Sequence, residues 1–158
     1  MATRHRILFV CMGNICRSPT AHGVFLKLLE QEGEGLLVEV DSAGTHSYHI
    51  GSAPDRRSAE TARRRGYDLS PLRARQVDPD DFERFDLLLA MDSANYRHLL
   101  GMASEEHHPR VKMFLEFAEN YEDTDVPDPY YGGDRGFEHV LDLVEDASRG
   151  LLRYLRER

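Results

Sequence analysis

The segment Cys11–Ser18, with the sequence CMGNICRS, holds a cysteine and an arginine with five residues between them. A thiolate is a strong nucleophile, and a guanidinium can bind two phosphate oxygens through parallel hydrogen bonds. Gly13 and Asn14 are residue types that tolerate positive φ, so the loop can curl until its backbone N–H groups face inward. The spacing of cysteine and arginine is weak evidence alone, but together with this loop composition it predicts a phosphate-binding loop, with Cys11 as the nucleophile and Arg17 as the clamp.

The segments on either side of this loop predict a strand that leads in and a helix that leads out. Residues 6–10 form an apolar run typical of a strand buried on both faces. Apolar residues then recur at helical spacing over residues 21–29. Ser18 is expected to be the N-cap and Pro19 the first helical residue, so that the helix begins right after Arg17. A helix N-terminus favours an anion, which fits the predicted phosphate site.

The rest of the chain alternates predicted strands with predicted helices. Further strands are expected at residues 36–41, 85–91 and 111–115, and further helices at 55–65, 93–101 and 137–155. This alternation predicts a single α/β domain over residues 1–158, built on a parallel sheet. Ligands bind beyond the carboxyl ends of the strands in such sheets. Because Cys11, Ser42, Asp92 and the loop carrying Asp128 each follow a strand, we expect all four at one edge.

Composition narrows the class of protein. The chain has 158 residues and a formal net charge of −8, which argues against a nucleic-acid binder. Its two cysteines lie in one loop and make no disulfide framework, and no paired-histidine motif suggests a metal. The longest apolar runs are far too short to span a bilayer, and no signal peptide is visible. We therefore expect a cytoplasmic protein without metal or cofactor.

Four motifs together resemble those of the low-molecular-weight protein tyrosine phosphatases: CMGNICRSP at 11–19, DSAG at 41–44, MD at 91–92 and DPYY at 128–131. They occur in the family's order and span nearly the whole chain. The resemblance implies a four-stranded parallel sheet with helices on both faces. It also implies metal-independent hydrolysis of phosphotyrosine or other aryl phosphate monoesters through a cysteinyl-phosphate intermediate.

The resemblance also suggests partners. The substrate would be a phosphotyrosine-containing protein, and a cognate tyrosine kinase is a candidate partner. Neither nucleic acid nor membrane insertion is expected, and the chain would be a monomer or a weak dimer.

Asp128 is the expected general acid. A tyrosyl leaving group has a pKa of about 10, so its departure at neutral pH needs a proton donor. Pro127 and Pro129 flank Asp128 and restrict its backbone. Residue chemistry alone barely separates Asp128 from the other acids at 122–125, and the resemblance selects it.

The resemblance assigns further residues to the phosphate cradle and its support. The cradle comprises Met12, Gly13, Asn14, Ile15, Cys16 and Ser18, and Ser18 is also expected to donate to the thiolate. Asn14 would hold the turn of the loop with Ser42 within reach, and Asp92 would cap a helix and support the site. Family members often contribute a histidine to this network where the present chain has Leu72.

Three tyrosines are expected to wall the pocket and stack on the substrate ring: Tyr48, Tyr130 and Tyr131. Tyr48 stands where the family commonly has a tryptophan. Two roles are open for Cys16, which either packs beneath the loop or forms a regulatory disulfide with Cys11 after oxidation.

Three other functions fit parts of this pattern. Thioredoxin-coupled arsenate reductases of similar fold need resolving cysteines outside the loop, and this chain has none. Protein-arginine phosphatases of the same family tend to have threonine where Ile15 stands. A non-catalytic phosphate-binding or redox-sensing module would have no use for a general acid at position 128.

Overall fold

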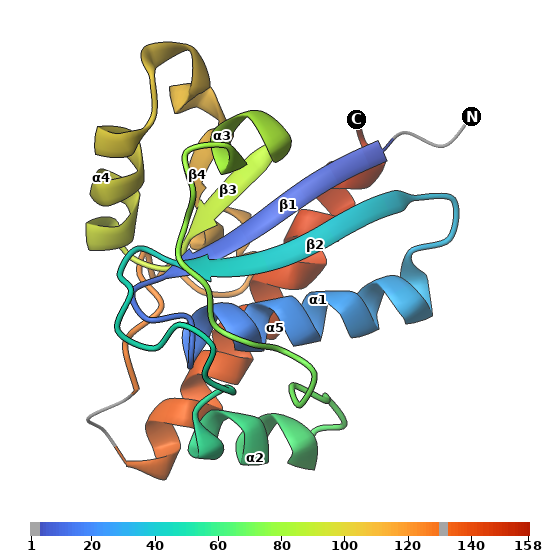
Figure 1. Ribbon diagram of the computed structural model, residues 1–158. Helices are drawn as coiled ribbons and strands as arrows, with labels where there is room; N and C mark the ends of the chain where they lie inside the picture. Colours follow the sequence, from blue (N-terminus) through green and yellow to red (C-terminus); the bar gives the residue numbers. More distant parts are fainter. Residues whose placement is uncertain (1–3, 130–132) are drawn as a thin grey trace.

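The computed structural model describes residues 4–129 and 133–158, and its centre is a four-stranded parallel sheet (Figure 1). The strands are β1 (Arg4–Cys11), β2 (Leu37–Gly44), β3 (Leu87–Ala90) and β4 (Val111–Met113). Their order is β2-β1-β3-β4, and every adjacent pair is parallel. The predicted α/β class is confirmed, and residues 37–44 form the expected edge strand.

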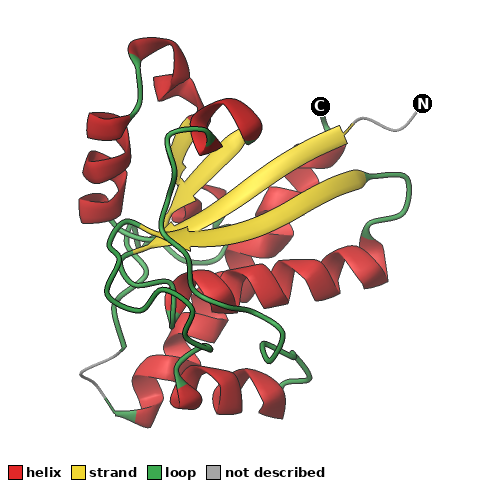
Figure 2. Ribbon diagram, in the orientation of Figure 1, coloured by secondary structure: helices red, strands yellow, loops and turns green. Residues whose placement is uncertain are grey.

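Helices cover both faces of the sheet, as Figure 2 shows. α1 (Arg17–Glu32) and α5 (Asp134–Arg156) pack on one face, with α2 (Arg56–Arg64) against their outer side. The other face carries α3 (Asp81–Arg84) and α4 (Ser93–Met102). The 3₁₀ helices η1 (Glu105–Arg110) and η2 (Phe114–Phe117) flank β4.

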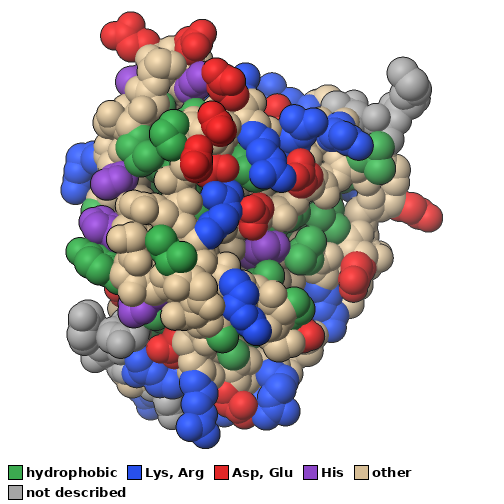
Figure 3. Space-filling view, viewed as in Figure 1, with side chains coloured by type: hydrophobic (Ala, Val, Ile, Leu, Met, Phe, Trp, Pro, Cys, Tyr) green, Lys and Arg blue, Asp and Glu red, His purple; other side chains and the backbone are tan. Residues whose placement is uncertain are grey.

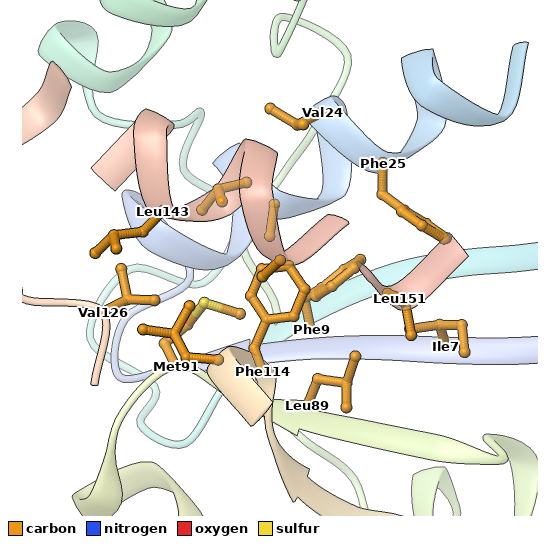
Figure 4. Close-up of a cluster of buried hydrophobic side chains, with 14 of the residues drawn as sticks. Ile7, Phe9, Val24, Phe25, Leu89, Met91, Phe114, Val126, Leu143 and Leu151 are labelled. Atoms are coloured by element: carbon orange, nitrogen blue, oxygen red, sulfur yellow. The ribbon is translucent and has the colours of Figure 1, made fainter. Parts of the chain in front are cut away.

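Successive side chains of a strand point to opposite sides, and helices cover both sides of β1, so the strand is buried on both faces. Phe9 packs under α1 and α5, where its ring meets Phe25 and Phe114 edge-on at centroid distances of 5.9 and 5.1 Å (Figure 4). Leu8 and Val10 point the other way, into a second cluster beneath α3 and α4. These two cores fix the carboxyl end of β1, where Cys11 lies.

The start of α1 corrects one prediction. The helix begins at Arg17, its N-cap is Cys16, and Ser18 is its second residue rather than its cap. The hydroxyl of Ser18 instead lies 2.9 Å from Cys11 Sγ and accepts a hydrogen bond from Asn14. The loop thus uses this hydroxyl, and the helix begins two residues earlier than the cap signal indicated.

Other element boundaries also differ from the prediction. β2 extends to Gly44, because its parallel pairing with β1 continues to the end of that strand, so Ser42 lies within β2 rather than after it. β4 ends at Met113, and the apolar residues that follow enter η2. α3, η1 and η2 are too short to produce a readable hydrophobic period.

Gly150 lies inside α5 at a point of close contact. A Cβ built on this residue would be 1.7 Å from the backbone oxygen of Phe117, which belongs to η2. Glycine in a helix usually weakens it, but here the missing side chain lets α5 approach η2.

We therefore expect Gly150→Ala to lower the free energy of unfolding by about 1–3 kcal/mol, the usual cost of overpacking. Urea denaturation measures this change. Gly101→Ala is the matched control, because a Cβ at that helical glycine meets nothing within 4 Å. A Gly150→Ala variant as stable as Gly101→Ala would contradict the close approach.

Candidate active site

The loop between β1 and α1 is held in its curled form by Asn14. This residue has φ of 58°, in the left-handed region that the sequence predicted for this loop. Its side-chain amide donates to Ser18 Oγ at 2.8 Å, and its Oδ1 accepts from the backbone N–H of Arg75 at 3.0 Å. Asn14 therefore ties the turn both to the start of α1 and to a segment far away in the sequence.

Gly44, the last residue of β2, allows the loop to pack closely. A Cβ at this position would be 2.7 Å from the backbone oxygen of Met12. The backbone N–H of Thr45 donates to the carbonyl of Cys11 at 2.9 Å, and that of His46 donates to the carbonyl of Met12 at 3.0 Å. The first half of the loop is thus bonded to the end of β2, which leaves little freedom for Cys11 to move.

Cys11 is buried and surrounded by donors. Its sulfur lies 2.9 Å from Ser18 Oγ and accepts a hydrogen bond from the backbone N–H of Ser18 at 3.5 Å. It also faces the N-terminus of α1, where the helix dipole favours negative charge. These contacts hold the sulfur at the base of the curled loop, beside the first turn of α1.

Arg17 is held by its carboxylate and carbonyl partners. One guanidinium nitrogen, Nη1, donates to Asp92 Oδ2 at 2.6 Å and to the carbonyl of Val126 at 3.1 Å. The other, Nη2, lies 3.8 Å from Asp128 Oδ2. The side chain is only 4% exposed. Burial disfavours its charge, but the negative groups at Cys11, Asp92 and Asp128 outweigh burial and raise the pKa of Arg17.

Asp92 performs two structural tasks at once. Its Oδ1 accepts the backbone N–H of Asn95 at 2.8 Å and so caps α4, as the sequence predicted. Its Oδ2 accepts from Arg17. The capping interaction fixes the carboxylate, and the carboxylate in turn orients the guanidinium.

Two supporting residues were not predicted from the sequence. His22 Nδ1 lies 2.9 Å from Ser42 Oγ, and both side chains are buried, so this contact joins α1 to β2. Arg75 makes ion pairs with Asp41 and Asp81, which anchor the segment that bonds to Asn14.

Leu72, at the position where a histidine is common in the family, is a half-buried apolar residue.

The sequence did hold a signal for His22, because this histidine comes four residues after Ser18 and so lies on the same helix face. Ser42 thus bonds to His22, while the side chain of Asn14 bonds to Ser18 and Arg75.

His22 makes the stability of the fold dependent on pH. Burial lowers the pKa of His22, and the nearby charge of Asp41 offsets this only in part. The unfolded chain therefore binds a proton below about pH 6.5 that the folded chain excludes, so stability falls as pH falls through that region. The loss is complete below the folded-state pKa and absent well above the unfolded one.

We expect His22→Gln, which keeps a hydrogen-bonding group but cannot titrate, to remove this contribution. The slope of unfolding free energy against pH between 5 and 7 should flatten by up to about 1.4 kcal/mol per pH unit. Urea titrations of both proteins at several pH values measure it. Parallel pH curves for the two proteins would show that His22 is not the group responsible.

Most of the predicted catalytic and cradle residues line one cleft of about 350 Å³ at the carboxyl edge of the sheet, whereas Asn14 and Ser18 are buried and do not line it. It is lined by Cys11, Met12, Gly13, Ile15, Cys16, Arg17, Tyr48, His49 and Asp128. His49 was not predicted, and its only signal was its place beside Tyr48. The predicted wall residues Tyr130 and Tyr131 lie outside the described residues. The cleft thus joins a thiol, a guanidinium and a carboxyl group.

Cys16 differs from Cys11 in its surroundings. Burial is the main cause that raises the pKa of the Cys16 thiol to about 12, although a hydrogen bond with Ser58 opposes it. Both cysteines are free thiols in this structure. A thiol held in its neutral form suits packing beneath the loop, and its role after oxidation stays a prediction.

Charge is unevenly spread over the surface. On the face seen in Figure 3, basic side chains gather over α2 at the lower edge, whereas acidic and basic side chains lie side by side in the upper half. Within residues 4–129 and 133–158, no group of three histidine, cysteine or acidic side chains is placed to hold a metal ion. Nor does any helix in those ranges have the length and apolar character needed to cross a membrane.

Comparison with known proteins shows the family to which the chain belongs. The family model described as low molecular weight phosphotyrosine protein phosphatase matches residues 6–158. The chain belongs to that family. A low molecular weight protein-tyrosine-phosphatase of Streptomyces coelicolor is 45% identical over 156 residues, covering 97% of this chain and 94% of the relative. The human low molecular weight phosphotyrosine protein phosphatase is 40% identical over 149 residues, covering 92% of each.

Solved structures agree with the family assignment. The crystal structure of a protein tyrosine phosphatase from Entamoeba histolytica matches with a TM-score of 0.93 and 40% identity, over 97% of each chain. The recognised family, the four-stranded fold and the class of enzyme are thereby confirmed. Its homologues and structural neighbours show that this chain is a protein-tyrosine-phosphatase of a metal-independent family.

Proposed function

We propose that this phosphatase hydrolyses phosphotyrosine and other aryl phosphate monoesters through a cysteinyl-phosphate intermediate. The observation that carries the proposal is the meeting of Cys11, Arg17 and Asp128 in one cleft. Arg17 and Asp128 lie 3.8 Å apart across it.

In the first step Cys11 Sγ attacks phosphorus as the bond from phosphorus to the tyrosyl oxygen breaks. Asp128, protonated, gives its proton to the leaving oxygen, so tyrosine departs neutral. Arg17 and the loop N–H groups stabilise the charge on the three equatorial oxygens. The products of this step are free tyrosine and phosphate bonded to sulfur.

In the second step water attacks the phosphorus of the cysteinyl-phosphate. Asp128, now a carboxylate, accepts the water's proton, and the S–P bond breaks to return the thiolate and release inorganic phosphate. The donors around Cys11 favour this step, because they stabilise the thiolate as a leaving group.

The lining of the cleft favours phosphotyrosine over phosphoarginine as the substrate. Ile15 lines the cleft with an apolar, half-buried side chain. Such a side chain packs well against a flat aryl ring but gives a guanidinium no hydrogen bond. Arsenate reduction is not favoured either, since both cysteines of the chain lie within the loop.

The physiological partners extend this proposal. A phosphotyrosine-containing protein is the proposed substrate, and a cognate tyrosine kinase and a monomeric or weakly dimeric state remain predictions. The cytoplasmic location is likewise a prediction, which cell fractionation with an antibody to the chain would test.

The test of the proposed function is a comparison of substrates on the purified protein. We expect kcat/KM for phosphotyrosine to exceed that for phosphoserine and phosphoarginine, and arsenate to be reduced at no measurable rate with thioredoxin. Chelating agents should not change turnover. Comparable rates on phosphoarginine would contradict the aryl preference.

The intermediate needs its own measurement. Rapid acid quenching during turnover of a phosphotyrosine peptide, followed by mass spectrometry, should find one phosphate on the peptide that contains Cys11. Phosphate on another residue would contradict the mechanism.

A further inference from the structure

The pocket wall at Tyr48 is exposed. Tyr48 lines the cleft, yet the residue is 69% exposed, so packing against the protein interior does little to fix its rotamer. A side chain free to change rotamer loses conformational entropy whenever a ligand requires one orientation. Something on the surface must therefore hold the ring if it is to serve as a wall.

His46 supplies that contact. The rings of His46 and Tyr48 are stacked, with centroids 5.2 Å apart and planes 11° apart. Offset stacking of aromatic rings is a favourable arrangement at this separation. Tyr48 is thus supported from the side by a residue only two positions earlier in the same loop.

His46 is itself fixed at several points. Its backbone N–H donates to the carbonyl of Met12 in the phosphate loop at 3.0 Å. Its Nδ1 lies 2.7 Å from Thr45 Oγ1, which restricts rotation of the ring. The ring of His98, which belongs to α4, also lies 5.4 Å from the His46 ring.

Through these two ring contacts His46 connects Tyr48, which lines the cleft, to His98 of α4. Histidine side chains gather in Figure 3 on the side where α4 meets the loops at the carboxyl edge of the sheet. The N-cap of α4 is Asp92, the residue that holds Arg17. One helix therefore supports both the guanidinium and, through His46, the pocket wall.

We propose that His46 is a positioning residue, which orients Tyr48 so that its ring meets the aryl group of the substrate. The inference rests on the proposed function, since it deepens the account of the same site. His46 does not touch the phosphate in this scheme. Its loss should weaken binding of aryl groups and leave the phosphate chemistry intact.

The test compares His46→Ala with His46→Phe, which restores a ring without restoring the imidazole nitrogens. His46→Ala should raise KM for phosphotyrosine about two- to tenfold, the range expected for one aromatic pair. Its kcat and the inhibition constant of inorganic phosphate should stay at wild-type values. His46→Phe should bring KM back toward wild type, and His107→Ala, which changes a histidine in η1, is the matched control.

Two further arms make the result decisive. In a Tyr48→Ala background, His46→Ala should have no additional effect on KM, because the wall it positions is gone. An additive effect would overturn the proposal, as would an equal weakening of inorganic phosphate, which would indicate distortion of the loop. Failure of His46→Phe to restore KM would also overturn it.

A binding measurement separates this proposal from the proposed function. The affinity of phenylphosphonate, which cannot be hydrolysed, is measured by calorimetry for wild type and the same variants. The same two- to tenfold loss in His46→Ala supports the proposal even for a chain that fails to turn over phosphotyrosine. Unchanged phenylphosphonate affinity in His46→Ala overturns it.

Discussion

Cys11→Ser is expected to abolish turnover of phosphotyrosine, with a loss in kcat of about four orders of magnitude or more. A serine hydroxyl in the same place is far less nucleophilic than a thiolate, and its alkoxide is a poor leaving group in the second step. The phosphate cradle remains, because Asn14, Arg17 and the loop N–H groups do not depend on the sulfur for their positions. Steady-state kinetics measure the loss, and calorimetric titration with vanadate measures the binding that should survive.

The second cysteine of the loop provides the control. Cys16 is also buried, but its thiol is held in the neutral form, so Cys16→Ser should retain turnover of the same order as wild type. Appreciable aryl phosphatase activity in Cys11→Ser would contradict the assignment of Cys11 as the nucleophile. Loss of vanadate binding in Cys11→Ser would instead show that the sulfur holds the loop in shape.

Asp128→Ala should lower kcat for phosphotyrosine by ~10²–10⁴, the usual contribution of a general acid. Asp128 is placed for this role, since it lines the cleft and lies 3.8 Å from Arg17. The defect should shrink for aryl phosphates with acidic leaving groups, which depart without a proton. A plot of log kcat against leaving-group pKa should therefore be steeper for the variant than for wild type.

Asp123→Ala is the matched control for this experiment. Asp123 belongs to the same acidic stretch, but its carboxylate faces His139 at 3.8 Å. Asp123→Ala should leave the dependence of kcat on leaving-group pKa unchanged. If Asp128→Ala lost the same factor for every leaving group, Asp128 would not be the proton donor.

The sequence was most informative where local chemistry decides local structure. The apolar run into Cys11 predicted a central buried strand, and Asn14 was correctly placed in a turn with positive φ. Asp92 was correctly predicted as a cap because capping depends only on the next few residues. The cap at Ser18 was wrong because its hydroxyl bonds to Cys11 and Asn14 of the preceding loop, and the helix already begins at Arg17.

Contacts between residues far apart in sequence could not be predicted in this way. Arg75 meets Asn14 across 61 positions, and its partners are brought together only by the packing of β2. The same holds for His22 and Ser42, and for the contact of Gly150 with η2. Each depends on how elements pack, which hydrophobic periodicity does not specify.

The cleft is built from parts with unequal freedom to change. Its floor joins β1 to α1, and the bonds of Asn14 and Arg17 to distant segments fix it in place. Its walls come instead from connecting loops, one carrying Tyr48 and the other Asp128. Loops tolerate substitution better than packed elements do. Evolution can therefore retune which phosphorylated protein is accepted by altering the walls, while the reaction at the floor is inherited unchanged.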